Sequence, residues 1–306
     1  MTPANVPHQA AQPKPGVPPP LVSIVTPSLN QGRYIADAIE SVIAQGYPAT
    51  EHIVVEGGSE DETRTVLERY AAHPHIRVIE DVPPRGQSAA VNTGFRAARG
   101  DVIGWLNADD RYCAGAFWAA VEALGNGAAL CYGDWEVIDE NGAVVTSLTA
   151  GKFDRREQLD GLSTRFAQPT VFVRRELFDE VGYLDESLHY VMDLDFWLRA
   201  TRTHDFRYVH RTLAQFRHHP ESKTVSHGSS FYAERRRVAR AHGGPFFSSG
   251  LRRHWFQRVL GRRLATHVMW HLSRGAYLEA GRGAARADSR PPRCPLCRRG
   301  LLGGRP

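Results

Sequence analysis

The sequence has little cysteine and no long apolar run, and both absences narrow what the protein can be. Its 306 residues include four cysteines, of which Cys113 and Cys131 stand alone, so no disulfide framework is expected. No stretch approaches the ~20 consecutive apolar residues of a membrane-spanning helix. Residues 1–20 lack the basic start and apolar core of a secretory signal. Together these absences predict a cytoplasmic protein.

The composition is that of a soluble globular protein, with 42% hydrophobic and 23% charged residues. Residues 1–20 contain seven prolines and almost no large apolar side chains, which predicts a disordered leader. Residues 1–200 hold 16 Lys and Arg against 28 Asp and Glu, a net charge of −12. Residues 201–306 hold 22 against 5, a net charge of +17. Residues 201–306, the basic rear of the chain, are therefore predicted to contact phosphates, either of a nucleic acid or of a membrane surface.

Apolar runs alternate with amphipathic segments of about ten residues along the first part of the chain. Strands are expected at 21–26, 52–56, 76–80 and 102–106, with helices at 34–45, 62–70 and 87–98 between them. Ser59 and Glu62 have the spacing of a capping box at the start of the second helix. This alternation predicts an α/β fold of the nucleotide-binding type, with a mainly parallel central sheet flanked by helices.

The rest of the chain is less regular. Further helices are expected at 113–124, 175–181 and 193–201, and strands at 129–132, 169–173 and 209–216. Basic helices follow at 231–241 and 251–278, before a tail rich in Arg, Gly and Pro. The predicted organisation is a leader at 1–20, an α/β domain at 21–225, a basic helical extension at 226–280 and a flexible tail at 281–306.

Two adjacent carboxylates, Asp109 and Asp110, follow the strand at 102–106. Ligands bind at the carboxyl edge of such sheets, and carboxylates there suit Mg²⁺ or Mn²⁺ together with substrate phosphates. Asp and Asn are also common turn residues. The segment alone therefore leaves a metal site and a simple turn open.

Several motifs occur in a fixed order over residues 21 to 225, and together they resemble the family-2 glycosyltransferases. The matching segments are SIVTPSLNQ (23–31), IVVEGGSED (53–61), GQSAAVNTG (86–94), WLNADD (105–110), QP (168–169), LDESL (184–188) and MDLDFWLR (192–199). The resemblance implies a GT-A fold and an inverting transfer of a sugar from a nucleotide-diphosphate sugar to an acceptor hydroxyl.

The resemblance also assigns roles to the acidic corner. Asp109 and Asp110 correspond to the family's Asp-x-Asp region, which holds Mg²⁺ or Mn²⁺ against the donor diphosphate. The metal then acts as a Lewis acid on the leaving phosphate. Asn107 occupies the first acidic position of that motif, so the two aspartates are the expected metal ligands.

Donor binding is the second implied role. The residues that the resemblance places against the nucleotide sugar are Thr26, Pro27, Asn30, Glu56, Gln87, Asn92, Asn107 and Asp109. Glu56 stands where the family often has an acidic pair, here reduced to one carboxylate by Gly57. A competing interpretation is that Gln87 only begins a helix.

Asp193 corresponds to the family's catalytic carboxylate, with Met192 where a glutamate usually precedes it. A carboxylate near the acceptor hydroxyl serves as general base. Asp195 is the alternative base, and either aspartate can instead cap the helix that follows. Four further candidates near the diphosphate or the acceptor are Gln168, Arg217, His219 and Lys223.

The basic rear carries an amphipathic pattern at 251–264 that suits either an anionic membrane face or packing against the catalytic domain. Nucleic acid is the less favoured partner. Cys294 and Cys297 form half of a zinc site with no second pair, so no zinc is predicted.

The sequence thus predicts a metal-dependent inverting glycosyltransferase of surface polysaccharide or glycolipid assembly. Its partners are a nucleotide-diphosphate sugar donor and a glycan or lipid-linked acceptor, at the cytoplasmic face of a membrane. Two alternatives stay open: a non-catalytic nucleotide-sugar binding module, suggested by Asn107, Gly57 and Met192, and a nucleic-acid-binding protein that uses the basic rear.

Overall fold

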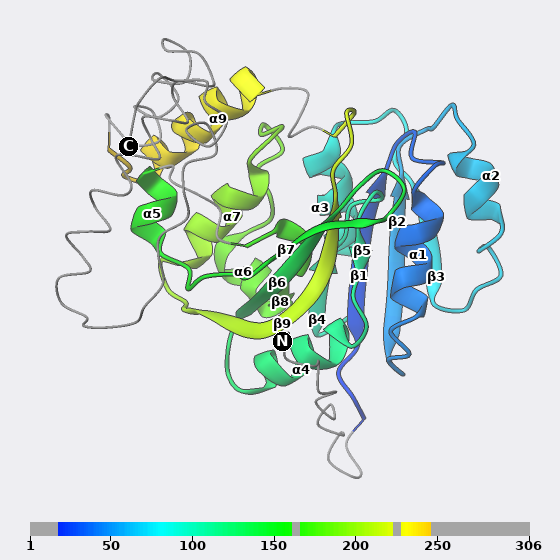
Figure 1. Ribbon diagram of the computed structural model, residues 1–306, viewed down its shortest axis with the longest axis horizontal. Helices are drawn as coiled ribbons and strands as arrows, with labels where there is room; N and C mark the ends of the chain where they lie inside the picture. Colours follow the sequence, from blue (N-terminus) through cyan, green and yellow to red (C-terminus); the bar gives the residue numbers. More distant parts are fainter. Residues whose placement is uncertain (1–17, 161–165, 223–227, 246–306) are drawn as a thin grey trace, which may run out of the picture.

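A computed structural model describes residues 18–160, 166–222 and 228–245 (Figure 1). Its first half is a parallel sheet with the strand order β3-β2-β1-β4. The strands are β1 (Val22–Ser28), β2 (Thr50–Glu56), β3 (Ile76–Glu80) and β4 (Val102–Trp105), and the connecting helices are α1 (Ile35–Ile43), α2 (Thr63–Glu68) and α3 (Gln87–Ala97). The predicted βα alternation is confirmed here, with element ends shifted by a few residues.

The sheet continues beyond β4, but its second half is mixed. Strand β4 pairs antiparallel with β8, which pairs antiparallel with β6, and β6 then runs parallel to β9. The added strands are β5 (Arg111–Tyr112), β6 (Leu130–Ile138), β7 (Val144–Leu148), β8 (Phe172–Arg174) and β9 (Phe206–Arg217). The sheet is therefore less parallel than predicted, because only the first four strands are joined by helical crossovers.

Further helices surround this second half. They are α4 (Ala116–Gly125), α5 (Arg155–Asp160), α6 (Glu176–Val181), α7 (Met192–Ala200) and α9 (Gly228–Ala241), with a 3₁₀ turn at Gln168–Thr170. The strand predicted at 169–173 is wrong in its first half, because Pro169 sits at the start of that 3₁₀ turn. Strand β7, whose residues are all exposed, lacks the alternation that would reveal it from sequence.

The core lies between the sheet and its helices. Strands β1, β2 and β4 are buried along almost their whole length, as expected for strands covered on both faces. Helix α3 packs so closely on β1 that a Cβ added at Gly94 would lie 2.3 Å from Cγ1 of Val25. This close packing fixes the start of α3 beside the carboxyl end of β1.

The predicted capping box of α2 is wrong. The Ser59 hydroxyl accepts a hydrogen bond from the Asn30 amide at 2.8 Å instead of capping the helix. Asp61, one residue before the N-cap position Glu62, accepts the Thr63 amide with its carboxylate at 2.9 Å. A carboxylate two residues nearer the helix therefore replaces Ser59, and the helix begins at Thr63.

Helix α9 packs against α7 and α5 at the end of the molecule away from α2 (Figure 1). The sequence places α9 in the basic extension, yet it contacts two helices, α5 and α7, of the domain predicted at 21–225. No helix in the described parts of the chain is long and apolar enough to cross a membrane. Several predictions concern residues outside the described part of the chain: the leader up to residue 17, the site residue Lys223, the predicted helix at 251–278, and the pair Cys294 and Cys297.

Candidate active site

A cleft of about 600 Å³ opens where the carboxyl ends of β1 and β4 meet the starts of α3 and α7. Helix α9 closes one side of it through Phe231 and Arg235. Seven of the predicted site residues line the cleft: Pro27, Gln87, Asn107, Asp109, Gln168, Asp193 and His219. Segments more than 190 residues apart in the chain thus converge on one concave site, at the sheet edge where such folds bind ligands.

Three residues predicted to contact the nucleotide form hydrogen bonds within the protein instead. Thr26 is fully buried and its hydroxyl bonds to Nε2 of His52 at 2.8 Å. Asn30 adopts a left-handed conformation and accepts the Glu60 amide. Glu56 accepts the amides of Gly58 and Ser59 at 2.9 and 2.6 Å. These contacts shape the loops beside the cleft, and none of the three side chains lines it.

The two carboxylates after β4 point in different directions. Asp109 lines the cleft, and its Oδ2 lies 3.0 Å from Nε2 of His219. Asp110 is fully buried and accepts the backbone N–H of Arg217 at 2.9 Å and the amide of Asn107 at 3.2 Å. Burial and the neighbouring Asp109 charge raise the pKa of Asp110 well above its ordinary value. Of the two aspartates predicted as candidate metal ligands, only Asp109 lines the cleft.

Arg217 supports this acidic corner from behind. Its guanidinium is almost fully buried, donates to the carbonyl of Asp109 at 2.8 Å and pairs with Asp37 at 2.6 Å. It also reaches the carbonyls of Asp139 and Glu140. Arg217 therefore anchors the loop that presents Asp109. It was predicted to lie near the diphosphate or the acceptor, but its side chain does not line the cleft.

A set of amides forms the floor of the cleft. The Oδ1 of Asn107 accepts from Nε2 of Gln87 at 2.9 Å and from the Trp105 indole at 3.0 Å. Gln168 accepts from the Asn107 amide at 3.2 Å and donates to the Trp105 carbonyl at 2.7 Å. Gln87 is thus more than a helix start, because it ties α3 to the end of β4.

Asp193 lies in the first turn of α7 and lines the cleft. Its carboxylate accepts the Leu194 amide at 2.7 Å. Burial raises the pKa of Asp193 to about 6, although that amide and the charge of Arg235 oppose the rise. A carboxylate with a pKa near neutrality is well matched to accept a proton from a hydroxyl.

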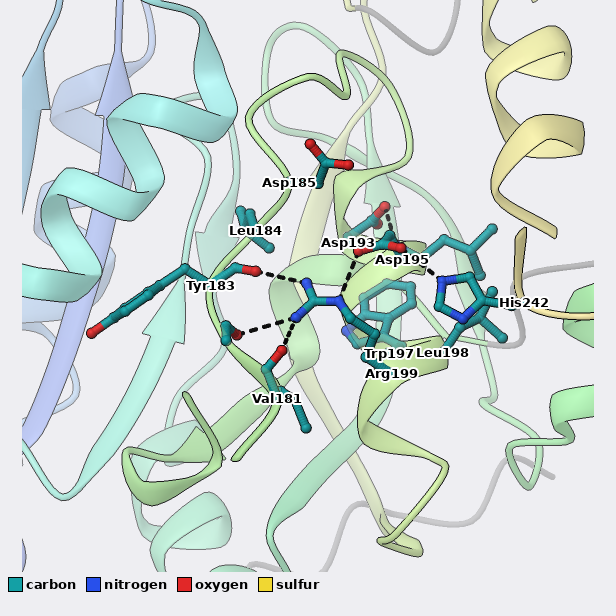
Figure 2. Close-up of polar contacts among 12 residues, drawn as sticks. Val181, Tyr183, Leu184, Asp185, Asp193, Asp195, Trp197, Leu198, Arg199 and His242 are labelled. Atoms are coloured by element: carbon teal, nitrogen blue, oxygen red, sulfur yellow. Dashed lines mark hydrogen bonds and ion pairs between the residues drawn. The ribbon is translucent and has the colours of Figure 1, made fainter. Parts of the chain in front are cut away.

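Asp195 has a structural role instead (Figure 2). Its carboxylate pairs with Nε of Arg199 at 2.9 Å and with Nε2 of His242 at 2.7 Å. Arg199 also donates to the backbone carbonyls of Val181, Gly182 and Tyr183. Asp195 therefore helps to fix α7 against the preceding loop and the end of α9. It is not among the residues that line the cleft, and the N-cap of α7 is Val191.

Asn92 also serves the scaffold. Its side chain is fully buried in α3, where it donates to the Leu184 carbonyl at 2.9 Å and accepts the Leu184 amide at 3.0 Å. It also donates to Glu186 at 2.9 Å. Asn92 thus holds the 184–188 segment against α3. It was predicted to contact the donor, but it does not line the cleft.

Four charged lining residues were not predicted: Asp81, Arg85, Glu221 and Arg235. Asp81 follows β3 and pairs with Arg85 at 2.9 Å. The rule that ligands bind at strand ends, applied to the third strand, would have found it. Arg235 comes from α9 and is 8% exposed. No local signal in the sequence distinguishes it from the arginines beside it, because only packing turns it inward.

The acidic corner offers few ligands to a divalent cation. Among the described residues no three His, Cys, Asp or Glu side chains gather into a metal site. Asp109 with His219 provides one carboxylate and one imidazole at the cleft surface. Because Mg²⁺ commonly binds through one or two carboxylates plus substrate phosphates, these groups fit a metal that arrives with a diphosphate. Asp110 does not fit as a direct ligand, since its carboxyl is enclosed.

Comparison with known proteins identifies relatives over most of this fold. Residues 23–182 match the model of the family described as glycosyl transferase family 2. An uncharacterized glycosyltransferase of Rickettsia prowazekii is 30% identical over 213 residues, which are 67% of this chain. The chain spans 66% of the length of that relative.

Solved structures share the fold. The TarS fragment 1–349 of S. aureus, in complex with UDP-GlcNAc, has a TM-score of 0.59 at 20% identity, over 72% of this chain and 66% of its own. The mannosyltransferase PcManGT of Pyrobaculum calidifontis, in complex with GDP-Man and Mn²⁺, has a TM-score of 0.56 at 18% identity. It covers 88% of this chain and 76% of its own. At these identities the likeness shows the fold, and it confirms the predicted GT-A architecture.

Proposed function

The chain belongs to glycosyl transferase family 2, and from this premise we propose that it transfers a sugar from a nucleotide-diphosphate sugar to an acceptor hydroxyl with inversion. The observation that carries the proposal is the placement of Asp109, His219 and Asp193 on one cleft. Asp109 and His219 provide a polar corner for a diphosphate. Asp193 provides a base with a pKa near 6.

The proposed transfer is a single displacement. A hydroxyl of the acceptor gives its proton to the Asp193 carboxylate as its oxygen attacks the anomeric carbon. The bond from that carbon to the diphosphate breaks on the opposite face, so the configuration inverts. Asp193 is held in place by its position in the first turn of α7 and by the Leu194 amide.

We propose that Asp109, with His219 beside it, holds Mg²⁺ or Mn²⁺ together with the donor diphosphate. Such an ion, when bound, neutralises the charge that develops on the leaving diphosphate. The carbonyl of Asp109 is fixed by Arg217, so the carboxylate is presented by a braced loop. The Mn²⁺ bound by PcManGT supports the proposal of a divalent cation.

The donor sits, in this proposal, along the carboxyl ends of the parallel strands. Pro27, Gly57 and Asp81 line that end of the cleft, and Gln87, Asn107 and Gln168 line its floor. The UDP-GlcNAc of TarS and the GDP-Man of PcManGT support a nucleotide sugar as the donor class.

The acceptor proposal is a glycan or lipid-linked hydroxyl in surface polysaccharide or glycolipid assembly, as the sequence resemblance implies. Association with the cytoplasmic face of a membrane, through the basic residues beyond 245, belongs to the same proposal. The +17 charge of residues 201–306 supports it, because anionic lipids attract clusters of Lys and Arg.

The experiment is to incubate the protein with a panel of UDP- and GDP-sugars and to measure nucleoside diphosphate release with Mn²⁺ and with EDTA. We expect release from one or a few donors with Mn²⁺ and none with EDTA. Nucleotide binding without release from any donor would instead favour a non-catalytic binding module. Retention on DNA but not on anionic vesicles would favour the nucleic-acid alternative.

A further inference from the structure

Arg235 is a buried cation without a matching anion. Its side chain is 8% exposed and lines the cleft. Its guanidinium donates hydrogen bonds to the carbonyl and the side-chain oxygen of Gln158, both at the long distance of 3.4 Å. Among the described residues no carboxylate lies within 4.0 Å of its guanidinium. Burying a charge without an ion-pair partner destabilises the folded state, so such a group is expected to bind an anionic ligand.

The position of Arg235 is enforced by its helix. The neighbouring Glu234 accepts three successive backbone amides, those of His189, Tyr190 and Val191, at 2.7 to 3.1 Å. At the other end of α9, His242 bonds to Asp195 at 2.7 Å (Figure 2). Both contacts join α9 to α7 or to the loop before it. Arg235 is therefore held at a fixed place beside the start of α7.

Two carboxylates face this region, and they differ in availability. Glu234 is occupied by the three amides of the loop before α7. Asp193 interacts with Arg235 through its charge but forms no ion pair within 4.0 Å. The contacts of Glu234 hold Arg235 beside the start of α7, where Asp193 lies. Arg235 thus belongs to the base side of the cleft and not to the proposed diphosphate corner.

We propose that Arg235 is an anion-recognition residue for the acceptor, which is an acidic sugar carrying a carboxylate or phosphate near its attacking hydroxyl. This inference rests on the proposed function and specifies its acceptor class. The planar guanidinium suits both anions, because its parallel N–H groups match two oxygens of either one. An acceptor held there by its anion places a neighbouring hydroxyl toward Asp193.

The test compares the wild type with Arg235→Met, Arg235→Lys and the control Arg236→Met. Arg236 is the next residue on α9 and is exposed, so its loss removes the same charge outside the cleft. Affinities for glucuronate, glucose 6-phosphate and neutral glucose are measured by saturation-transfer NMR. Each titration is run with saturating UDP or GDP, so that the diphosphate corner is filled.

We expect the wild type and Arg236→Met to prefer one or both acidic sugars over glucose. We expect Arg235→Met to lose about tenfold or more of that affinity, the usual cost of a charge-assisted bidentate contact. The probe that is preferred distinguishes a carboxylate from a phosphate. Arg235→Lys keeps the positive charge but loses the two parallel N–H donors of the guanidinium, so we expect an intermediate loss of affinity for the acidic sugar. This variant tests the proposal even if Arg235→Met does not fold.

The proposal is overturned if the wild type shows no preference for acidic sugars, or if both Arg235 variants bind them like the wild type. It is also overturned if Arg235→Met weakens nucleotide binding instead, which would assign the residue to the donor. Nucleotide affinity of the wild type is measured in the same samples. Its absence would count against the proposed function, whereas the sugar titrations report on Arg235 separately.

Discussion

Replacing Asp193 with Asn should remove activity and make the folded protein more stable. The pKa of Asp193 rises from 3.8 to about 6 in the folded state, mainly through burial. Because one pKa unit corresponds to about 1.4 kcal/mol, ionising this carboxyl costs the folded state about 3 kcal/mol at most. The side chain is partly exposed, so we expect a gain of roughly 1–3 kcal/mol for Asp193→Asn at pH 7.5.

The pH dependence follows from the same shift. Below pH 3.8 the carboxyl is protonated in both states and costs nothing. As the pH rises toward 6 the unfolded state ionises first, so the wild type loses stability over this interval and no more above it. Transfer should show the opposite trend and fall as the pH drops through about 6, because the base becomes protonated.

The assay is urea unfolding of the wild type and Asp193→Asn between pH 4 and 8, with donor turnover measured on the same samples. Asp195→Asn is the matched control, because it removes the same charge from the same helix but breaks the contacts to Arg199 and His242. We expect this control to be destabilised by about 1–3 kcal/mol. An Asp193→Asn protein that is active, or no more stable than the wild type at pH 7.5, would refute the reasoning.

Three further changes test other parts of the site. Asp109→Asn should lower Mn²⁺-dependent nucleotide affinity about tenfold or more, whereas Asp110→Asn should leave it within about threefold, because only Asp109 faces the cleft. Calorimetric titration with and without Mn²⁺ measures both affinities, and equal losses would contradict the assignment of Asp109 as the ligand. Glu234→Ala should increase deuterium exchange at residues 189–191 and slow donor turnover, because three amides lose their acceptor; unchanged exchange there would argue against the contact. Gly94→Ala should destabilise the protein by about 1–3 kcal/mol in urea unfolding, since its Cβ would overlap Val25; an unchanged midpoint would show that α3 can shift.

The first half of the fold was predictable because its signals are local. Strands β1, β2 and β4 are buried apolar runs, and helices separate the first four strands, so the order of these elements follows from the local pattern. The second half depends on pairing between distant segments, such as β6 with β9, which a single sequence does not encode in its local pattern. Strand β7 was missed because its exposed residues show no alternation, and the six-residue helix α5 was also missed.

The candidate site was predictable as a set of positions, but the direction of each side chain was not. The motifs placed Asp109 and Asp110 together, yet a single turn sends one to the cleft and the other to Arg217. Thr26 and Glu56 likewise lie at strand ends and turn inward to partners that are distant in sequence or in the next loop. Arg235 was missed because its burial comes from the packing of α9, which charge counting cannot reveal.

The most direct test of the central claim is the configuration of the sugar that the enzyme first releases. An α-linked nucleotide sugar that the protein turns over is incubated with Mn²⁺, and the anomeric proton of the transferred or hydrolysed sugar is followed by NMR. Single displacement with Asp193 as base predicts that the β anomer appears first, and that Asp193→Ala binds the nucleotide but releases no sugar. An α product, or release of sugar by Asp193→Ala at the wild-type rate, would contradict the account.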